Sequence, residues 1–260
     1  MALSENQQKA ITELLEKTIR SKLKRYDRET TSMPFLARLI QDSEKISAYS
    51  FIHSISTSLG MSIYEQASVI IASERGFECA RNYGVGGAIS REQRETIQRI
   101  VNQLRNKQRV ANIQQEIQEV LGASWQGGVF QKSGNIADFY MRKDGQEHFF
   151  EIKTVKPNID VFEKSKTKLL EWVARRRLAV NVHLAFPYNP YHPKPYSRYT
   201  EQGLMQPGAD LLVGEEYWDF IGGEQTFKDL LVVFDKVGKQ FKNELSAKFK
   251  QIARQQIDSY

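Results

Sequence analysis

The chain has 260 residues, which is enough for one large domain, or for one domain with an appended helical region. Hydrophobic residues make up 40% of the sequence and charged residues 26%, as in an ordinary globular protein. The net charge of +6 favours an anionic partner, and nucleic acid is the first candidate.

Two further features exclude whole classes of protein. Cys79 is the only cysteine, so the chain can hold neither a disulfide framework nor a cysteine-based zinc site. The N-terminus lacks a basic start followed by an apolar core, and no apolar run reaches the roughly 18 residues of a membrane span. We therefore expect a cytoplasmic protein that does not associate with a membrane.

Helical periodicity dominates the first 120 residues. Ser4 can cap a first amphipathic helix, and Ser90 can cap a long polar helix that Gly122 ends. The glycine-rich segment 84–87 is predicted to be a flexible turn, since no Gly-Lys-Ser/Thr follows it as in a phosphate-binding loop. The apolar spacing predicts helices over residues 4–26, 35–40, 44–59, 62–75 and about 91–120.

A β-hairpin is predicted around Asp144-Gly145, the dipeptide most favourable for a two-residue turn. Residues opposite each other across this hairpin would have numbers that sum to 289, so that Asp138 faces Glu151. Opposed residues point to the same side, and side chains alternate along each strand. One face, mostly core material, then holds Phe139, Met141, His148, Phe150 and Ile152. The other face presents Asp138, Tyr140, Arg142, Glu147, Phe149, Glu151 and Lys153.

Two carboxylates and a lysine thus meet at one end of the hairpin. Directly opposed carboxylates repel each other unless a cation or a proton lies between them. A hard divalent ion with oxygen ligands would relieve this repulsion. The alternative is an exposed strand end with an ordinary Glu151–Lys153 ion pair.

The spacing Asp138, Glu151, Lys153 across a hairpin resembles the PD-(D/E)xK nuclease superfamily. The resemblance implies a Mg²⁺-dependent phosphodiesterase in which Asp138 and Glu151 bind the metal and Lys153 positions or activates the attacking water. The sequence departs from the motif in one place, since Ala137 stands where the motif has proline.

Glu65 has two competing interpretations. Ser62-Ile63-Tyr64-Glu65 has the form of a capping box, in which Glu65 accepts from the Ser62 backbone. Restriction-type nucleases often carry a further metal-site glutamate on a helix before the hairpin, and Glu65 stands in such a place. Glu65 is therefore also a candidate catalytic residue.

The chain after the hairpin is expected to continue as helix, strand and strand. Apolar spacing predicts a helix over 161–178, strands at about 178–186 and 209–213, and helices over 215–223, 226–236 and 239–256. The first helix is strongly basic, which suits phosphate contacts, although a solvated helix face is the alternative. Its candidate DNA contacts are Lys164, Lys168, Arg175, Arg176 and Arg177.

Five of the seven prolines fall within residues 187–207, together with four tyrosines. Proline lowers the entropic cost of ordering a loop, and tyrosine, lysine and arginine contact DNA grooves and backbone well. A rigid aromatic surface loop without a partner is the alternative. The candidate DNA contacts here are Tyr188, Asn189, Tyr191, Lys194 and Arg198.

Three segments resemble the TdeIII-type family of Type II restriction endonucleases: Glu-Ile-Lys-Thr-Val-Lys-Pro-Asn at 151–158, Tyr-Asn-Pro-Tyr at 188–191 and Gly-Ala-Asp-Leu-Leu-Val-Gly-Glu-Glu-Tyr-Trp at 208–218. This resemblance spans roughly residues 40–250. It implies a homodimer that cuts double-stranded DNA at a short GGNCC-like palindrome, in a system with a cognate DNA methyltransferase.

We therefore expect an α/β fold, with a restriction-endonuclease-like core of mixed sheet flanked by helices and with additional N- and C-terminal helices. A single nuclease domain would span 1–260. Residues 1–120 would be mainly helical, residues 121–215 would form the catalytic core with the DNA-binding loop, and residues 216–260 would form C-terminal helices. Two alternatives stay open at this point, a non-catalytic DNA-binding module of the same fold and a structure-specific repair or recombination nuclease.

Overall fold

The structure of the chain is a computed structural model that describes residues 2–26, 33–153, 157–197 and 203–257. The chain divides into two compact units. The first comprises Leu3–Tyr64 and Lys228–Tyr260, and the second comprises Glu65–Phe227. The four predicted catalytic residues all belong to the second unit. The single nuclease domain expected from the sequence stays a prediction.

The first unit is built from helices α1 (Glu5–Arg25), α2 (Pro34–Ile40), α3 (Ser43–Ser58) and most of α9 (Thr226–Ile257). Ser4 caps α1 through a capping box: its hydroxyl accepts from the Gln7 backbone, and the Gln7 side chain accepts from the Ser4 backbone. The predicted cap is thus confirmed. The two C-terminal helices expected over 226–236 and 239–256 are one continuous helix, α9. Among the described residues, no helix combines the length and apolar character that crossing a membrane requires.

The helix break expected at Gly60 is wrong. Residues Leu59–Ile63 form a π-helical turn, and α4 (Tyr64–Glu74) follows it directly. Ser62 therefore lies inside helical backbone and is not an N-cap, so the capping-box interpretation of Glu65 is also wrong. Instead, the Glu65 carboxylate accepts two hydrogen bonds from the Arg81 guanidinium.

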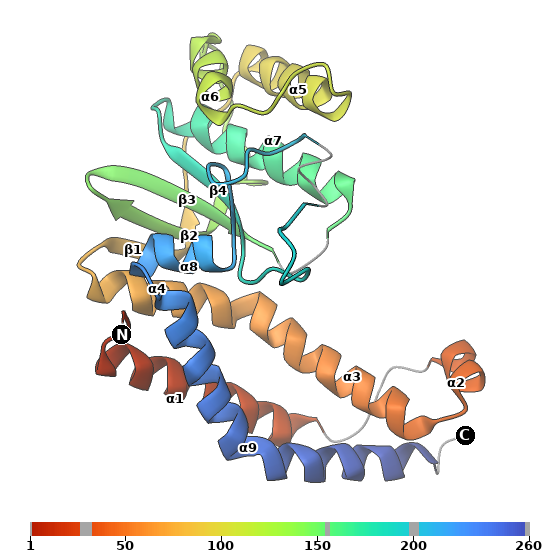
Figure 1. The fold of residues 1–260 in the computed structure, drawn as a ribbon. Coiled ribbons are helices and arrows are strands. Elements are labelled where there is room, and N and C mark those ends of the chain that lie inside the picture. The colour runs from red at the N-terminus through yellow and green to blue at the C-terminus, as the bar shows by residue number, and fades with distance from the viewer. Residues whose placement is uncertain (1, 27–32, 154–156, 198–202, 258–260) are drawn as a thin grey trace. The chain divides into compact units, whose positions relative to one another are not determined.

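A mixed sheet forms the centre of the second unit (Figure 1). Within the described residues its order is β1 (Glu78–Gly84), β2 (Ile136–Lys143), β3 (Gln146–Ile152), β4 (Asn181–Phe186) and β5 (Leu211–Val213). The first three strands are antiparallel, whereas β3, β4 and β5 run parallel. Strand β1 was not predicted from the sequence and lies in the region expected to be mainly helical.

The predicted hairpin and its register are confirmed. Asp144 and Gly145 both have positive φ, at 51° and 78°, which is the backbone of a type I′ turn. The strand pairs run from Phe139 opposite Phe150 to Lys143 opposite Gln146, so the numbers of opposed residues sum to 289. Asp138 lies one residue beyond the last pair, at the open end of the hairpin.

Helices cover both faces of this sheet (Figure 1). Helix α7 (Ile159–Arg176) packs on one face and is covered in turn by α5 (Arg91–Arg105) and α6 (Ile113–Gly122), while α4 and α8 (Glu215–Gly222) lie on the other. The sequence assigned one hairpin face to the core, and the structure shows that the other face is buried as well along most of its length. Tyr140 and Phe149 are 1% and 0% exposed, because they pack under α7.

The single helix predicted over 91–120 is two helices. Ser90 caps α5 with a capping box, as expected, but the helix ends at Arg105. Lys107 then adopts a positive φ of 57°, and Asn112 caps α6 by accepting from the Gln115 backbone. Gly122 ends α6, as the sequence predicts.

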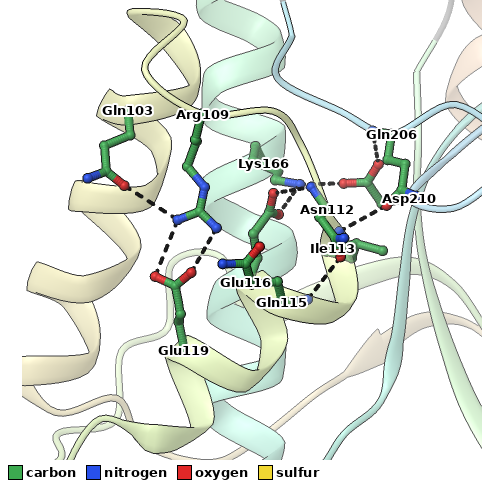
Figure 2. A network of polar contacts seen from close by, with 10 residues as sticks. All are labelled: Gln103, Arg109, Asn112, Ile113, Gln115, Glu116, Glu119, Lys166, Gln206 and Asp210. Atoms are coloured by element: carbon green, nitrogen blue, oxygen red, sulfur yellow. Dashed lines mark hydrogen bonds and ion pairs between the residues drawn. The ribbon is translucent and has the colours of Figure 1, made fainter.

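A buried ion network holds α7 in place (Figure 2). The Lys166 ammonium pairs with the carboxylates of Glu116 on α6 and Asp210 before β5, and the exposed fraction of all three residues is 0%. Asp210 also accepts from the Gln206 backbone at 2.6 Å, and Glu116 accepts from the Asn112 backbone at 2.9 Å. The network joins α6, α7 and the segment before β5, because each charge is compensated by a partner from another element.

Candidate active site

The end of the β2–β3 hairpin brings together three of the residues predicted from the sequence. Asp138 is partly buried, and its Oδ2 accepts from the Ile152 backbone N–H at 2.8 Å. Glu151 is 4% exposed, and its Oε1 lies 2.7 Å from Lys153 Nζ. The Lys153 backbone is held by its N–H, which donates to Ala185 O at 3.0 Å on the parallel strand β4. The pairing of β3 with β2 and with β4, together with the hydrogen bond from Ile152 to Asp138, thus positions all three residues.

A second lysine reaches the same carboxylate from helix α7. Lys168 Nζ lies 3.6 Å from Glu151 Oε1 and 5.1 Å from the centre of the Trp172 ring. The sequence predicts Lys168 as a phosphate contact but gives no sign that it lies beside the carboxylate of Glu151. Its side chain is 23% exposed, so the ammonium remains accessible from solution.

The two carboxylates and two lysines are electrostatically coupled. Burial raises the pKa of Asp138 above its usual value and nearby Glu151 adds to this, while Lys168, the Ile152 N–H and Lys153 oppose it. Burial by itself would lower the pKa of Lys153, but the contact with Glu151 outweighs it and the pKa is raised. Lys153 is therefore a fixed positive charge at neutral pH.

Glu65 and Arg81 form a second charged pair next to this cluster. Arg81 on β1 donates from Nε and Nη2 to one oxygen of Glu65, at 3.1 and 2.9 Å. Burial raises the pKa of Glu65, Arg81 partly offsets this, and the negative charge of Asp138 adds to the rise. Glu65 thus lies within electrostatic reach of Asp138, as an accessory carboxylate would, and Arg81 is a site residue that sequence reasoning missed.

The chemistry of this donor set fits a magnesium ion. Glu151 Oε2 is buried and has no hydrogen-bond partner among the described residues, so one carboxylate oxygen is left without compensation. Within the described ranges of the chain, no three His, Cys, Asp or Glu side chains are grouped so that they could enclose an ion. Mg²⁺ suits such a site, because it usually takes one or two carboxylates and completes its shell with water and substrate phosphate.

The predicted basic surface of α7 is only partly present. Arg175 is 3% exposed and donates to the backbone oxygens of Gly87, Gln131 and Ser133, at 2.9 to 3.3 Å. Its guanidinium is buried against the loops at Gly87 and at Gln131–Ser133, so a contact with DNA phosphates, which stays a prediction, would require these loops to open. The Arg176 guanidinium makes a bidentate contact with the buried Glu147 carboxylate, at 2.8 to 3.0 Å. The Arg176 side chain is itself partly buried. Its charge is thus already neutralised within the fold.

Two of the predicted basic residues of this segment do lie at the surface. Lys164 is exposed and, with Lys168, lines a cavity of about 700 Å³ beside α7. Arg177 is the C-cap of α7 with a φ of 55°, and its guanidinium lies 4.4 Å from the centre of the exposed Trp125 ring. Both residues remain available to an anionic partner.

The proline-rich loop is described up to Ser197, so Arg198 lies outside the described residues. Asn189 organises the loop: its side chain accepts from the Tyr191 backbone at 2.9 Å and donates to Lys194 O at 2.8 Å. Tyr188 and Lys194 are exposed, whereas Tyr191 is partly buried against Tyr196. Tyr188 and Lys194 are therefore the most accessible of the residues predicted to bind DNA here.

Fold and site together define a class of protein. A mixed sheet flanked by helices, with Asp138, Glu151 and Lys153 at the end of its central hairpin, is a restriction-endonuclease-like α/β core. The chain belongs to the HinfI family of Type II restriction endonucleases, whose model matches residues 3–238. It is therefore a site-specific deoxyribonuclease.

Individual relatives agree with this assignment. The chain is 29% identical to the Type II restriction enzyme HgiCII of Herpetosiphon aurantiacus over 76% of its own length and 75% of the relative. It is 28% identical to HgiEI of the same organism, over 84% and 81% of the two chains. MjaII of Methanocaldococcus jannaschii is 28% identical, over 73% of this chain and 54% of its own. No solved structure matches the chain.

The prediction of a Type II restriction endonuclease is thus confirmed. The sequence motifs resemble the TdeIII type, and the family whose model matches is that of HinfI. The GGNCC-like recognition sequence implied by the TdeIII-type resemblance stays a prediction.

Proposed function

We propose that this chain cuts double-stranded DNA at a short GGNCC-like palindrome in a Mg²⁺-dependent reaction, with Asp138, Glu151 and Lys153 as its catalytic residues. The observation that carries the proposal is their convergence at one strand end, where a buried oxygen of Glu151 has no hydrogen-bond partner among the described residues. A non-catalytic DNA-binding module has no physical reason to keep two mutually repelling carboxylates together.

Each residue has a role that follows from its contacts. Asp138 and Glu151 would hold Mg²⁺, which supplies charge stabilisation for the phosphoryl oxygens and the leaving oxygen when it is bound. The Ile152 N–H keeps one oxygen of Asp138 oriented. Lys153, held by β4 and kept protonated by Glu151, would orient the attacking water through its N–H donors. Glu65 stays a proposed accessory carboxylate, and Arg81 fixes its orientation.

DNA contacts are proposed for the accessible residues around this site. Lys164 and Lys168 on α7 and Arg177 at its C-cap would contact the DNA backbone. Tyr188, Asn189, Tyr191 and Lys194 in the proline-rich loop would contact backbone or bases. A palindromic site has twofold symmetry, and a twofold homodimer is the simplest protein that matches it. We further propose that the enzyme acts in the cytoplasm, alongside a DNA methyltransferase that protects the same sequence.

Digestion of phage DNA tests the proposal. Purified protein is incubated with the DNA with and without Mg²⁺, beside the variants Glu151→Ala and Asp144→Asn. Discrete fragments that require Mg²⁺ and Glu151 are the expected result, and Asp144→Asn should cut like the unmodified protein because Asn-Gly forms the same turn. Intact DNA in every lane would indicate a binding module instead. A smear, or preference for branched DNA over linear DNA, would indicate a different nuclease.

A further inference from the structure

We propose that Lys168 is a second catalytic lysine, which contacts a non-bridging oxygen of the scissile phosphate opposite Lys153. The proposal rests on the proposed function, since it assumes that Glu151 belongs to the reaction centre. It goes beyond a general backbone contact, because it places the Lys168 ammonium at the reacting phosphate and assigns it to the chemical step.

The geometry places both ammonium groups on one oxygen. Glu151 Oε1 lies 2.7 Å from Lys153 Nζ and 3.6 Å from Lys168 Nζ. The two lysines approach from different elements, Lys153 from the end of β3 and Lys168 from α7. A phosphate that enters this site would therefore meet a positive charge from each of two directions, and both are aligned by the same carboxylate.

Besides Glu151, the ring of Trp172 holds the Lys168 ammonium, and the helix that carries both residues is itself anchored. The Lys168 ammonium lies over the ring of Trp172, one turn further along α7, at 5.1 Å from the ring centre. Trp172 is itself fixed, because its indole N–H donates to Gly134 O at 2.8 Å. Two residues before Lys168, the buried Lys166 network anchors the helix to α6 and to the segment before β5 (Figure 2). This preorganisation is what a catalytic group requires and a general phosphate contact does not.

The charge balance of the site also favours a role for Lys168. Asp138 and Glu151 carry two negative charges, and Lys153 supplies one positive charge, so these three side chains have a net charge of about −1 before a metal ion binds. With Lys168 the four side chains sum to zero. Hydrolysis raises the negative charge on the phosphoryl group from one to two in the transition state, and an ammonium aimed at it stabilises the transition state more than the substrate.

Lys168 also lines a cavity of about 700 Å³ beside α7. The lining of this cavity includes Lys164 and Thr167 together with three acidic residues, Asp160, Glu163 and Glu171. The hydroxyl of Thr167 is already engaged, since it donates to Glu163 O at 2.9 Å. Lys168 is thus the cation of this cavity that also reaches Glu151.

The variant Lys168→Met tests the proposal, because methionine keeps the length and packing on Trp172 but removes the charge. Single-turnover cleavage should slow by about 100-fold or more. DNA affinity, measured with Ca²⁺ in place of Mg²⁺, should fall by less than about tenfold, as for one lost phosphate contact. Lys168→Arg, which keeps the charge, should recover a large part of the rate. Lys236→Met, at an exposed position of α9, serves as the control for removal of a surface charge.

Divalent-ion binding without DNA gives a second readout. The Lys168 ammonium competes with a cation for Glu151, so its removal should tighten the binding of Mn²⁺ by about 3- to 10-fold. A merely structural lysine would lower cation affinity or leave it unchanged. Slower cleavage together with tighter ion binding is therefore the expected combination, measured by calorimetric titration and rapid-quench kinetics.

The outcomes separate this inference from the proposed function. If Lys168→Met cuts at the rate of the unmodified protein while Glu151→Ala is inactive, the proposal for Lys168 is wrong and the active site stands. If Glu151→Ala also cuts normally, the active site itself lies elsewhere. Should Lys168→Met fail to fold, Lys168→Arg and Lys168→Gln decide: equal rates for these two would overturn the proposal.

Discussion

At the scale of single residues, Asp138 illustrates how the site is maintained at a cost in stability. Its pKa is raised mainly by burial, and Glu151 adds to this. For an acid whose folded pKa lies above its unfolded pKa, ionisation opposes folding at neutral pH, and this penalty disappears as the pH falls through the folded pKa. In the function proposed above, a divalent ion that binds the ionised oxygens would offset this penalty.

A first prediction concerns Asp138→Asn. The amide can still accept from the Ile152 N–H, yet it carries no charge, so in EDTA the variant should melt at or above the temperature of the unmodified protein. It should gain less stability from Mg²⁺ or Ca²⁺, since ligand linkage scales with affinity, and it should not cut DNA. Melting curves with and without metal check this, with Asp144→Asn as the control. Equal metal-induced shifts in both variants would mean that Asp138 does not bind the ion.

The sequence predicts some residues of this site and misses others. The positions of Asp138, Glu151 and Lys153 follow from the Asp-Gly turn, because the register of a two-residue hairpin is set by the turn alone. Lys168 and Arg81 reach the site through the packing of α7 and of β1 on the sheet, and no local pattern encodes that packing. The same reasoning fails for Arg175, whose burial depends on two loops distant in sequence.

At the scale of elements, the placement of α7 depends on the Lys166 network. The carboxylates of Glu116 and Asp210 are buried with it, so the lysine compensates two negative charges in the interior (Figure 2). Removing one partner of a buried ion pair leaves an uncompensated charge, which costs far more than the pair itself contributes.

A second prediction is therefore that Lys166→Met destabilises the protein strongly. The expected loss is about 3–5 kcal/mol in the free energy of unfolding, measured by urea titration. Lys164→Met, on the same helix but exposed, should change it by less than about 0.5 kcal/mol. Replacing Glu116 by Gln and Asp210 by Asn in addition should recover some of the loss. A Lys166→Met protein as stable as Lys164→Met would show that the network contributes little.

Strands β3 and β4 are linked by a pair of stacked histidines. His183 Nδ1 lies 2.8 Å from Ala209 O, a pure acceptor, so Nδ1 carries the proton and Nε2 accepts. His148 Nδ1, at 3.1 Å, must then donate to His183 Nε2. Both rings are neutral in this arrangement, and Phe150 and Phe220 pack around them. Burial lowers the pKa of each histidine to about 4, and at His148 the neighbouring His183 adds to this.

A third prediction follows for pH. Both folded pKa values lie below the unfolded value of about 6.5, so between about pH 6.5 and 4 the unfolded state binds more protons and stability falls as the pH falls. The loss should be on the order of a few kcal/mol for the pair. His148→Phe should reduce this slope, while His53→Gln, at an exposed position, should not. Urea titrations from about pH 4.5 to 7.5 measure the free energy of unfolding at each pH. Equal pH dependence in the unmodified protein, His148→Phe and His53→Gln would contradict the prediction.

Helices and strands can be predicted from the sequence where capping residues, apolar spacing or turn residues mark both of their ends. Capping residues and apolar spacing locate α1, α7 and α8 within a few residues, and the hairpin is predicted with its register. Strand β1 was missed because Glu-Cys-Ala-Arg-Asn-Tyr-Gly has no alternating apolar pattern, and its pairing with β2 alone makes it a strand. The break between α5 and α6 lacks glycine and proline. Contacts such as Arg109 with Glu119, and the Ile113 N–H with Gln206, fix that turn instead.

At the scale of the whole molecule, the excess positive charge has a different distribution from the one the sequence suggests. Lys166 and Arg175 are buried, and Arg176 is paired with Glu147, so half of the six basic residues between 163 and 178 do not offer free charge at the surface. We therefore expect exposed residues such as Lys164, Arg177 and Lys194, at α7 and in the proline-rich loop, to contribute to the electrostatic attraction of DNA.

The last prediction tests this distribution through the salt dependence of DNA binding. Each phosphate contact releases counterions, so log K falls with log[salt] with a slope of about −0.9 per contact. Lys164→Gln should reduce the slope by about one unit and weaken binding to specific and unrelated DNA alike. Arg175→Met should leave the slope of the folded protein unchanged but lower its stability by about 3 kcal/mol, because three backbone oxygens lose their donor.

Fluorescence anisotropy between about 50 and 200 mM salt, with Ca²⁺ present to prevent cleavage, measures these slopes. The two variants are matched in the charge that they remove, and they differ in whether that charge is exposed. A reduced slope for Arg175→Met would return this arginine to the DNA interface and would require the loops at Gly87 and Ser133 to open on binding. An unchanged slope for Lys164→Gln, with lost preference for one base, would instead assign Lys164 to direct recognition of the sequence.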